Sequence, residues 1–115
     1  MALKFKIVNL EDDRPTVERM RLRLDRTLAL ARSEGTDLLK LIHGYGSSGV
    51  GGALRVAVHS SLVRYKDSGL IRDFIPGANF RVSDETTWAL LKRAPEMKSD
   101  RDLGRENKGI TIVLL

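Results

Sequence analysis

The sequence predicts an α/β fold in two layers, with a four-stranded mixed sheet and two main helices on one of its faces. Short apolar runs alternate with two long segments of helical periodicity in the order β-α-β-α-β-β, and this alternation is typical of βαβ units. The length of 115 residues is enough for one domain with a two-layer core. Residues 1–115 are therefore expected to form a single domain.

The first half of the chain predicts a strand, a helix and a second strand. Residues 4–10 alternate apolar and charged side chains, which is the pattern of a half-buried strand. Residues 16–33 place apolar side chains at helical spacing, and Gly35 suits the end of that helix. Residues 38–43 form a nearly continuous apolar run, as expected for a central strand that helices cover.

The second half predicts a helix, two strands and an insert. The helix is expected from about residue 52 to 66, and a third strand over 70–75. The fourth strand, rich in β-branched residues, is expected over 109–115. The stretch at about 79–107 has no place in the core pattern, so we expect it to be an insert in which Trp88 anchors a short helix.

Composition limits the classes of function. The formal net charge is +5 and the pI is near 9.9, which favours a polyanionic partner such as DNA or RNA. There is no cysteine and there are only two histidines, so disulfides, thiolate sites and a zinc site are not expected. No apolar run approaches the roughly 18–20 residues of a membrane span, and the N-terminus lacks a signal-peptide pattern. We expect a cytoplasmic protein with no membrane partner and no cofactor, a divalent metal ion being left open.

The most informative segment joins the second strand to the second helix. The apolar run ends at His43, and five of the next nine residues are glycines. Glycine lets the backbone approach a ligand closely, and a helix N-terminus behind such a loop offers unpaired N–H groups to an anion. We therefore predict a phosphate or nucleic-acid site in this loop and the following helix, formed by Gly44, Tyr45, Gly46, Ser47, Ser48, Gly49, Gly51, Gly52 and Arg55.

Two better-known phosphate motifs do not fit this loop. Residues 44–49 match G-x-G-x-x-G, but the next strand does not end in the acidic residue that holds a ribose in dinucleotide-binding folds. The chain is also short for such a fold. The phosphate-loop pattern fails because Gly51 is followed by Gly52-Ala53 and not by Lys-Ser.

The two histidines and the helix arginines each have two interpretations. His43 is the candidate for proton chemistry near neutral pH, or it is a structural histidine that bonds backbone at the strand end. His59 lies mid-helix, where a surface or packing role is expected. The arginine face of residues 16–33, with Arg19, Arg23 and Arg26, is either solvated or a phosphate-contacting stripe.

These residues resemble a known family. Ile42-His43-Gly44-x-Gly46 followed by Gly52-x-Leu54-Arg55 is similar to the I-H-G-x-G…L-R signature of Smr (small MutS-related) domains. The similarity extends to the start of the first helix and to the last strand. It implies a two-layer α/β fold similar to the C-terminal domain of bacterial translation initiation factor three. It also implies nucleic-acid binding, and in several members nicking of DNA or RNA, in the setting of DNA repair or recombination. On this resemblance the family positions are taken by His43, Gly44, Gly46 and Arg55.

The first strand departs from the family pattern. Smr domains usually carry L-D-L-H-G there, whereas this chain has Asn9 in place of the acid and Glu11 in place of the histidine. The acidic residues 11–13 are either oxygen ligands for a divalent cation or a polar turn before the helix.

Three functions follow as hypotheses. The first is a nucleic-acid-binding domain that holds phosphate at His43–Gly52, and the second is an endonuclease in which His43 is a general acid or base. The third is a protein-interaction module that docks through the insert, with Trp88 and Leu91 as contacts.

Overall fold

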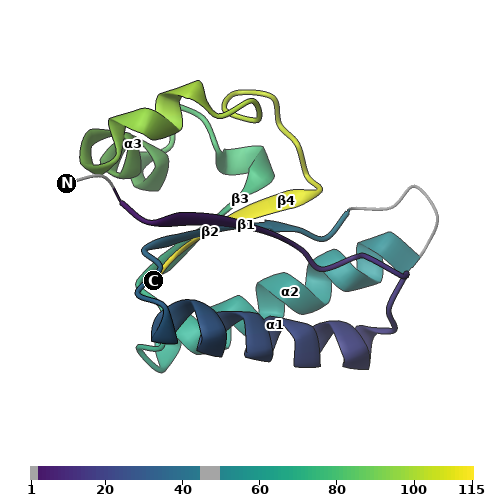
Figure 1. Cartoon of the computed structure of the whole chain (residues 1–115). Coiled ribbons are helices and arrows are strands. Elements are labelled where there is room, and N and C mark those ends of the chain that lie inside the picture. Colours follow the sequence, from purple (N-terminus) through teal and green to yellow (C-terminus); the bar gives the residue numbers. More distant parts are fainter. Residues whose placement is uncertain (1–2, 45–49) are drawn as a thin grey trace.

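The strands and helices follow the predicted order, with one more layer than expected. The computed structural model describes residues 3–44 and 50–115 (Figure 1). Along the chain the elements are β1 (Phe5–Asn9), α1 (Val17–Ser33), β2 (Leu38–Ile42), α2 (Val50–Asp67), β3 (Asp73–Pro76), the 3-10 helix η1 (Gly77–Asn79), α3 (Glu85–Arg93), the 3-10 helix η2 (Pro95–Ser99) and β4 (Ile110–Leu114).

The sheet is mixed, as predicted, and its strand order is β1-β2-β4-β3. Strands β1 and β2 are parallel because α1 connects them in a βαβ crossover. Strand β4 lies between β2 and β3 and is antiparallel to both. The third strand begins later than predicted, because the amides of Leu70 and Ile71 bond the carbonyl of Tyr65 at the end of α2.

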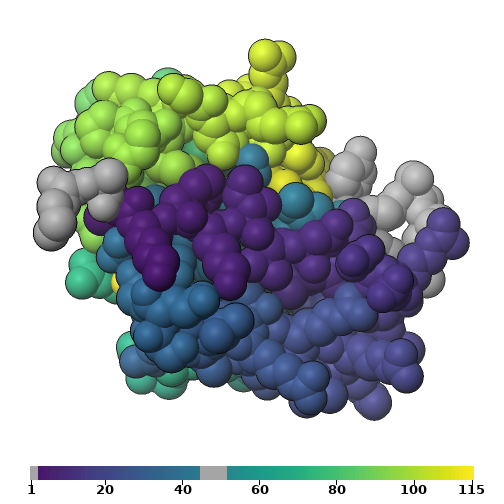
Figure 2. Space-filling model, viewed as in Figure 1, coloured from purple at the N-terminus to yellow at the C-terminus, as the bar shows by residue number. Residues whose placement is uncertain are grey.

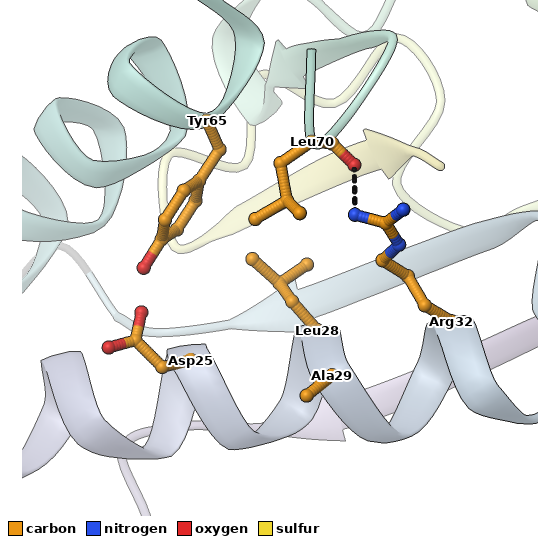
Figure 3. A pocket seen from close by; sticks show the side chains of 6 residues that line it. All are labelled: Asp25, Leu28, Ala29, Arg32, Tyr65 and Leu70. Carbon is orange, nitrogen blue, oxygen red and sulfur yellow. Dashed lines mark hydrogen bonds between the residues drawn. The ribbon is translucent and has the colours of Figure 1, made fainter. Parts of the chain in front are cut away.

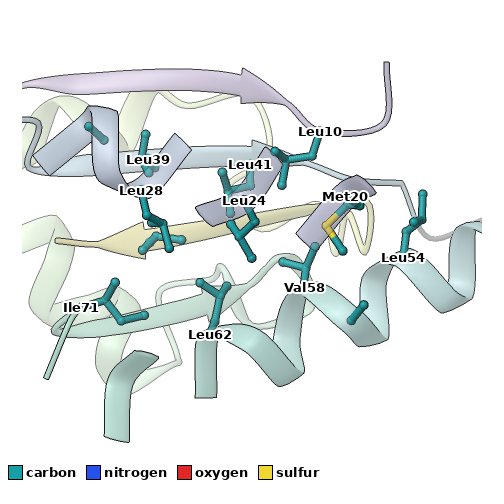
Figure 4. Close-up of a cluster of buried hydrophobic side chains, with 13 residues drawn as sticks. Leu10, Met20, Leu24, Leu28, Leu39, Leu41, Leu54, Val58, Leu62 and Ile71 are labelled. Atoms are coloured by element: carbon teal, nitrogen blue, oxygen red, sulfur yellow. The ribbon is translucent and has the colours of Figure 1, made fainter. Parts of the chain in front are cut away.

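Helices α1 and α2 cover one face of the sheet, as predicted (Figure 1). Thr16 caps α1 by accepting a hydrogen bond from the amide of Arg19 at 3.2 Å. The helices and the strands meet in a cluster of buried aliphatic side chains (Figure 4). Its labelled members are Leu10, Met20, Leu24, Leu28, Leu39, Leu41, Leu54, Val58, Leu62 and Ile71.

The predicted insert covers the other face of the sheet and forms a third layer (Figure 1). Strands β2 and β4 are buried on both faces, so their second row of apolar side chains also needs a cover. Helices α3 and η2 supply it. The second core contains Leu38, Ile75, Phe80, Leu90, Leu91, Ala94, Met97, Ile110, Ile112 and Leu114.

The insert is also held by a buried ion pair. Lys40, in the middle of β2, points to the insert and contacts Asp100 at 2.8 Å and Asp102 at 2.5 Å, with all three side chains at most 10% exposed. Burial alone disfavours the ammonium, but the two carboxylates outweigh it and raise the pKa of Lys40. Burial likewise opposes the Asp102 carboxylate, yet Lys40 and Asn107 lower its pKa. The insert is therefore fixed by charge as well as by apolar contacts.

The insert stops short of the sheet edge at β1. In the space-filling view β1 is the purple band between the insert above and α1 below (Figure 2). Phe5 and Ile7 of this strand remain 36% and 56% exposed. Within residues 3–44 and 50–115, no helix combines the length and hydropathy that crossing a membrane requires.

Candidate functional site

The predicted site lies at the end of the molecule where β1 and β2 finish and where α1 and α2 begin (Figure 1). His43 and Gly44 follow β2 directly. Their amides both donate to the carbonyl of Gly109, at 2.9 and 3.1 Å, so the start of β4 holds this turn. On the other side, the amide of Leu10 donates to the carbonyl of Ile42 at 2.7 Å. The backbone of residues 42–44, where the predicted site begins, is therefore hydrogen-bonded to Gly109 on one side and to Leu10 on the other.

The His43 ring is fully buried and both of its nitrogens have partners. Nδ1 lies 2.6 Å from the carbonyl oxygen of Gly44, and Nε2 lies 2.8 Å from the hydroxyl of Thr111. A carbonyl oxygen only accepts, so the proton of the neutral ring is on Nδ1. Nε2 is then an acceptor, and the Thr111 hydroxyl donates to it.

His59 completes a chain of hydrogen bonds. Its Nε2 lies 3.0 Å from the Thr111 hydroxyl. Because that hydroxyl donates its one proton to His43, it accepts from Nε2–H of His59. The two rings meet edge to face with centroids 5.6 Å apart, and the Phe74 ring lies 6.0 Å from the His59 ring. The chain runs from α2 through β4 to β2 and ends on the Gly44 carbonyl.

Both rings are neutral near pH 7. Burial lowers the pKa of His43 to about 4, opposed by its bond to the Gly44 carbonyl and helped by the nearby charges of His59 and Arg55. Burial, followed by the charge of Arg55, lowers the pKa of His59 as well. A neutral, fully bonded ring matches the structural interpretation of His43. General acid or base action would require the ring to leave these bonds.

Gly44 and Glu11 are in contact at the start of the site. Gly44 has a φ of +72°, and a Cβ at this position would lie 2.3 Å from Oε2 of Glu11. The amide of Glu11 donates to the Asn9 side chain at 2.9 Å, which shapes the end of β1. Of the two residues that depart from the family pattern, Glu11 thus places a carboxylate beside Gly44, and Asn9 holds the amide of Glu11.

Arg23 takes part in the same turn. Its guanidinium donates to the carbonyls of Leu10 and Asp12, so this arginine supports backbone, whereas Arg19 and Arg26 are exposed. In the described part of the chain, no three acidic, histidine or cysteine side chains gather as they would around a metal ion. The cation interpretation of residues 11–13 thus gains no support from these side chains.

The remaining predicted residues fall into two groups. Gly51, Gly52 and Arg55 lie in the first turns of α2, and Arg55 is partly exposed. The charge of Arg55 contributes to lowering the pKa of both imidazoles. The other predicted contacts, which are Tyr45, Gly46, Ser47, Ser48 and Gly49, lie outside the described residues.

A separate pocket of about 470 Å³ lies between α1 and the C-terminal part of α2 (Figure 3). The Asp25 carboxylate and the Tyr65 hydroxyl face each other across it, and Arg32 donates to the carbonyl of Leu70 at 3.3 Å. Tyr65 is near the end of α2, away from His43. Its lining residues do not include His43, Gly44 or Arg55 of the predicted site.

The insert offers one of the two predicted docking residues. Trp88 is 50% exposed, with Lys92 Nζ 5.9 Å from the ring centroid. Val82 is exposed and lines the same shallow hollow. Leu91, by contrast, is buried in the second core, so it is not available to a partner.

Sequence reasoning missed Thr111 and the partnership of the two histidines. Thr111 is fully buried in a strand of isoleucine and valine, and a lone hydroxyl in such a strand needs a polar partner. That signal was present in the sequence. Which partner it has depends on the register of β4 against β2, where Thr111 faces Leu41.

Comparisons with known proteins support the family resemblance and the fold. A family model described as the Smr domain matches residues 14–78. Among solved structures, the chain is similar to the crystal structure of the Smr domain of Thermus thermophilus MutS2, with a TM-score of 0.58 and 28% sequence identity over 96% of each chain. No curated protein matches the sequence.

Proposed function

This chain belongs to the Smr domain family, and we propose that it binds nucleic acid at the end of the molecule where β2 leads into α2. Smr domains are known for nucleic-acid binding and nicking. The matched residues, 14–78, include His43, Gly44 and Arg55. In this proposal, phosphate is held by the segment Gly44–Gly52, by the first turns of α2 and by Arg55.

The place of Arg55 in the fold carries the proposal. It lies in the N-terminal turns of α2 and is partly exposed, and α2 begins beyond Gly44, whose carbonyl bonds the His43 ring. A guanidinium beside a helix N-terminus is a favourable setting for a phosphate group. The net charge of +5 supports attraction to a polyanion over longer distances.

The proposal concerns binding rather than strand cleavage. The His43 ring is buried and both nitrogens are bonded, so we assign it to holding the Gly44 carbonyl. Nicking would need another proton-transfer group or a rearranged ring.

The test measures binding to labelled DNA duplex, single-stranded DNA and structured RNA by fluorescence anisotropy. We expect affinity to fall steeply between about 50 and about 200 mM salt, because phosphate contacts release counterions. Arg55→Ala is expected to weaken binding to all sequences and to reduce the salt slope by about 1. Arg93→Ala, at the end of α3 on the other face of the sheet, removes the same charge and is the matched control.

Two results would contradict the proposal. One is affinity that does not change with salt. The other is an Arg55→Ala variant that binds as the Arg93→Ala control does, which would move the contact away from α2.

A further inference from the structure

We propose that Thr111 and His59 are positioning residues of the nucleic-acid site. Through the ring of His43 they fix the carbonyl of Gly44, and with it the direction in which the chain leaves β2. The link to binding rests on the proposed function above. The hydrogen-bond chain itself rests on the geometry of the described residues.

The Thr111 hydroxyl is the centre of this arrangement. It lies 2.8 Å from Nε2 of His43 and 3.0 Å from Nε2 of His59. With Nδ1 of His43 donating to the Gly44 carbonyl, the proton directions along the chain are determined. Each group has one role: His59 donates to Thr111, Thr111 donates to His43, and His43 donates to Gly44.

These side-chain hydrogen bonds complement the backbone hydrogen bond of Gly44. The Gly44 amide donates to Gly109 at 3.1 Å, and the Gly44 carbonyl accepts from His43 at 2.6 Å. The amide is thus anchored to Gly109, the residue before β4, and the carbonyl is anchored by way of Thr111 in β4. Gly44 has a positive φ, which glycine adopts without steric cost.

The Thr111 hydroxyl is needed as a hydrogen-bond donor because its surroundings are otherwise aliphatic. Thr111 and His43 are fully buried, and the neighbouring β4 residues are aliphatic. Valine has the same shape as threonine but would leave Nε2 of His43 without a donor. Burying an unpaired polar atom is unfavourable, so the ring is expected to turn or change tautomer and release the Gly44 carbonyl.

The experiment compares Thr111→Val with Thr111→Ser, which restores a hydroxyl. The control is Thr87→Val, since Thr87 is also fully buried and donates its hydroxyl proton to the carbonyl of Asn79, but it lies in α3 on the other face of the sheet. We expect Thr111→Val to weaken nucleic-acid binding about tenfold, equivalent to one positioned hydrogen bond. Thr111→Ser is expected to restore most of it, and Thr87→Val to bind like the original chain.

Nitrogen-15 NMR of the imidazoles gives a readout that does not depend on binding. In the original chain, His43 is expected as the Nδ1–H tautomer and His59 as the Nε2–H tautomer. Thr111→Val should change the His43 pattern, and His59→Gln should disturb the same ring to a smaller extent. Thr87→Val should leave both rings unchanged.

The outcomes separate the two proposals. If the original chain does not bind nucleic acid while the NMR pattern is as expected, the proposed function fails and the hydrogen-bond chain remains. If the original protein binds nucleic acid, and Thr111→Val binds it as tightly as Thr87→Val does, the positioning role is overturned. A His43 ring unaffected by Thr111→Val overturns it as well.

Discussion

The carboxylate of Glu11 occupies the space that a side chain at Gly44 would need. A Cβ built there lies 2.3 Å from Oε2, and the backbone has a φ of +72°. Two effects therefore exclude other residues from this position, the left-handed backbone and the contact with Glu11. A comparison with Gly35 separates the two effects, because Gly35 has the same φ of +72° but open space around it.

Gly44→Ala is expected to lower the free energy of unfolding by about 1–2 kcal/mol for the backbone alone. Gly35→Ala should cost a similar amount, and any excess at Gly44 measures the contact with Glu11. In a Glu11→Ala background that excess should disappear, because the tip of a flexible side chain has been removed. Urea denaturation of the four variants checks this, and an excess that persists without Glu11 would contradict the contact.

Glu11→Gln is expected to strengthen nucleic-acid binding. The carboxylate lies beside Gly44, where a phosphate is proposed to bind, and like charges repel. The gain should be largest at low salt and should shrink as salt screens the charge. Asp37→Asn, at the other end of β2, removes an equal charge and should have little effect. Anisotropy titrations decide, and weaker binding by Glu11→Gln would point to a cation bridging Glu11 and phosphate.

Stability is expected to decrease as the pH falls from about 6.5 to about 4, because folding lowers the pKa of His43 from 6.5 to about 4. Within this window the unfolded chain binds a proton that the folded chain excludes, so acid favours unfolding. Protonation of the His43 ring is expected to lower the free energy of unfolding by roughly 3 kcal/mol across this range. Lowering of the His59 pKa acts in the same direction. Denaturation curves across this range should show a weaker pH dependence for His43→Gln, and an unchanged slope would refute the assignment.

Lys40→Met is expected to destabilise the fold by about 3–5 kcal/mol, because it leaves the two buried aspartates without their cation. Adding Asp100→Asn and Asp102→Asn should recover much of the loss. Lys6→Met is the control, since Lys6 pairs with Glu34 at the surface, where such pairs are worth at most about 1 kcal/mol. Equal losses for Lys40→Met and Lys6→Met would show that burial adds nothing.

Trp88→Ala is expected to leave nucleic-acid binding unchanged and to cost less stability than Leu91→Ala. Trp88 is half exposed on α3, whereas Leu91 is buried in the second core, where truncation costs about 2–5 kcal/mol. Thermal unfolding and the same anisotropy assay test both statements. Loss of nucleic-acid binding on Trp88→Ala would extend the proposed interface onto the insert.

Much of the fold could be predicted because its signals are local. The helical spacing of Met20, Leu24 and Leu28 and the apolar run of β2 each determine an element without reference to distant residues. The role of the insert could not be predicted in this way. Its core residues meet β2 and β4 only once the sheet exists, and Lys40 in an apolar run gives no sign of partners sixty residues away.

The candidate site also has a part that could be predicted from local sequence and a part that could not. The strand–glycine–helix segment was visible in the sequence, and so were both interpretations of His43. The hydrogen bonds of the His43 ring depend on the register that brings Thr111 next to His43 and His59, and this register could not be predicted. Hydroxyl and imidazole pairs that form across strands leave no spacing pattern along the chain.

The strand order has a consequence for how the protein assembles during synthesis. Strand β3 pairs with β4 alone, and β4 is the last strand of the series to leave the ribosome. Until residues 110–114 emerge, β3 has no strand to pair with, and the second core lacks Ile110, Ile112 and Leu114. A nascent chain that pauses before this point exposes apolar surface, so we expect both cores to close cooperatively only after β4 has emerged.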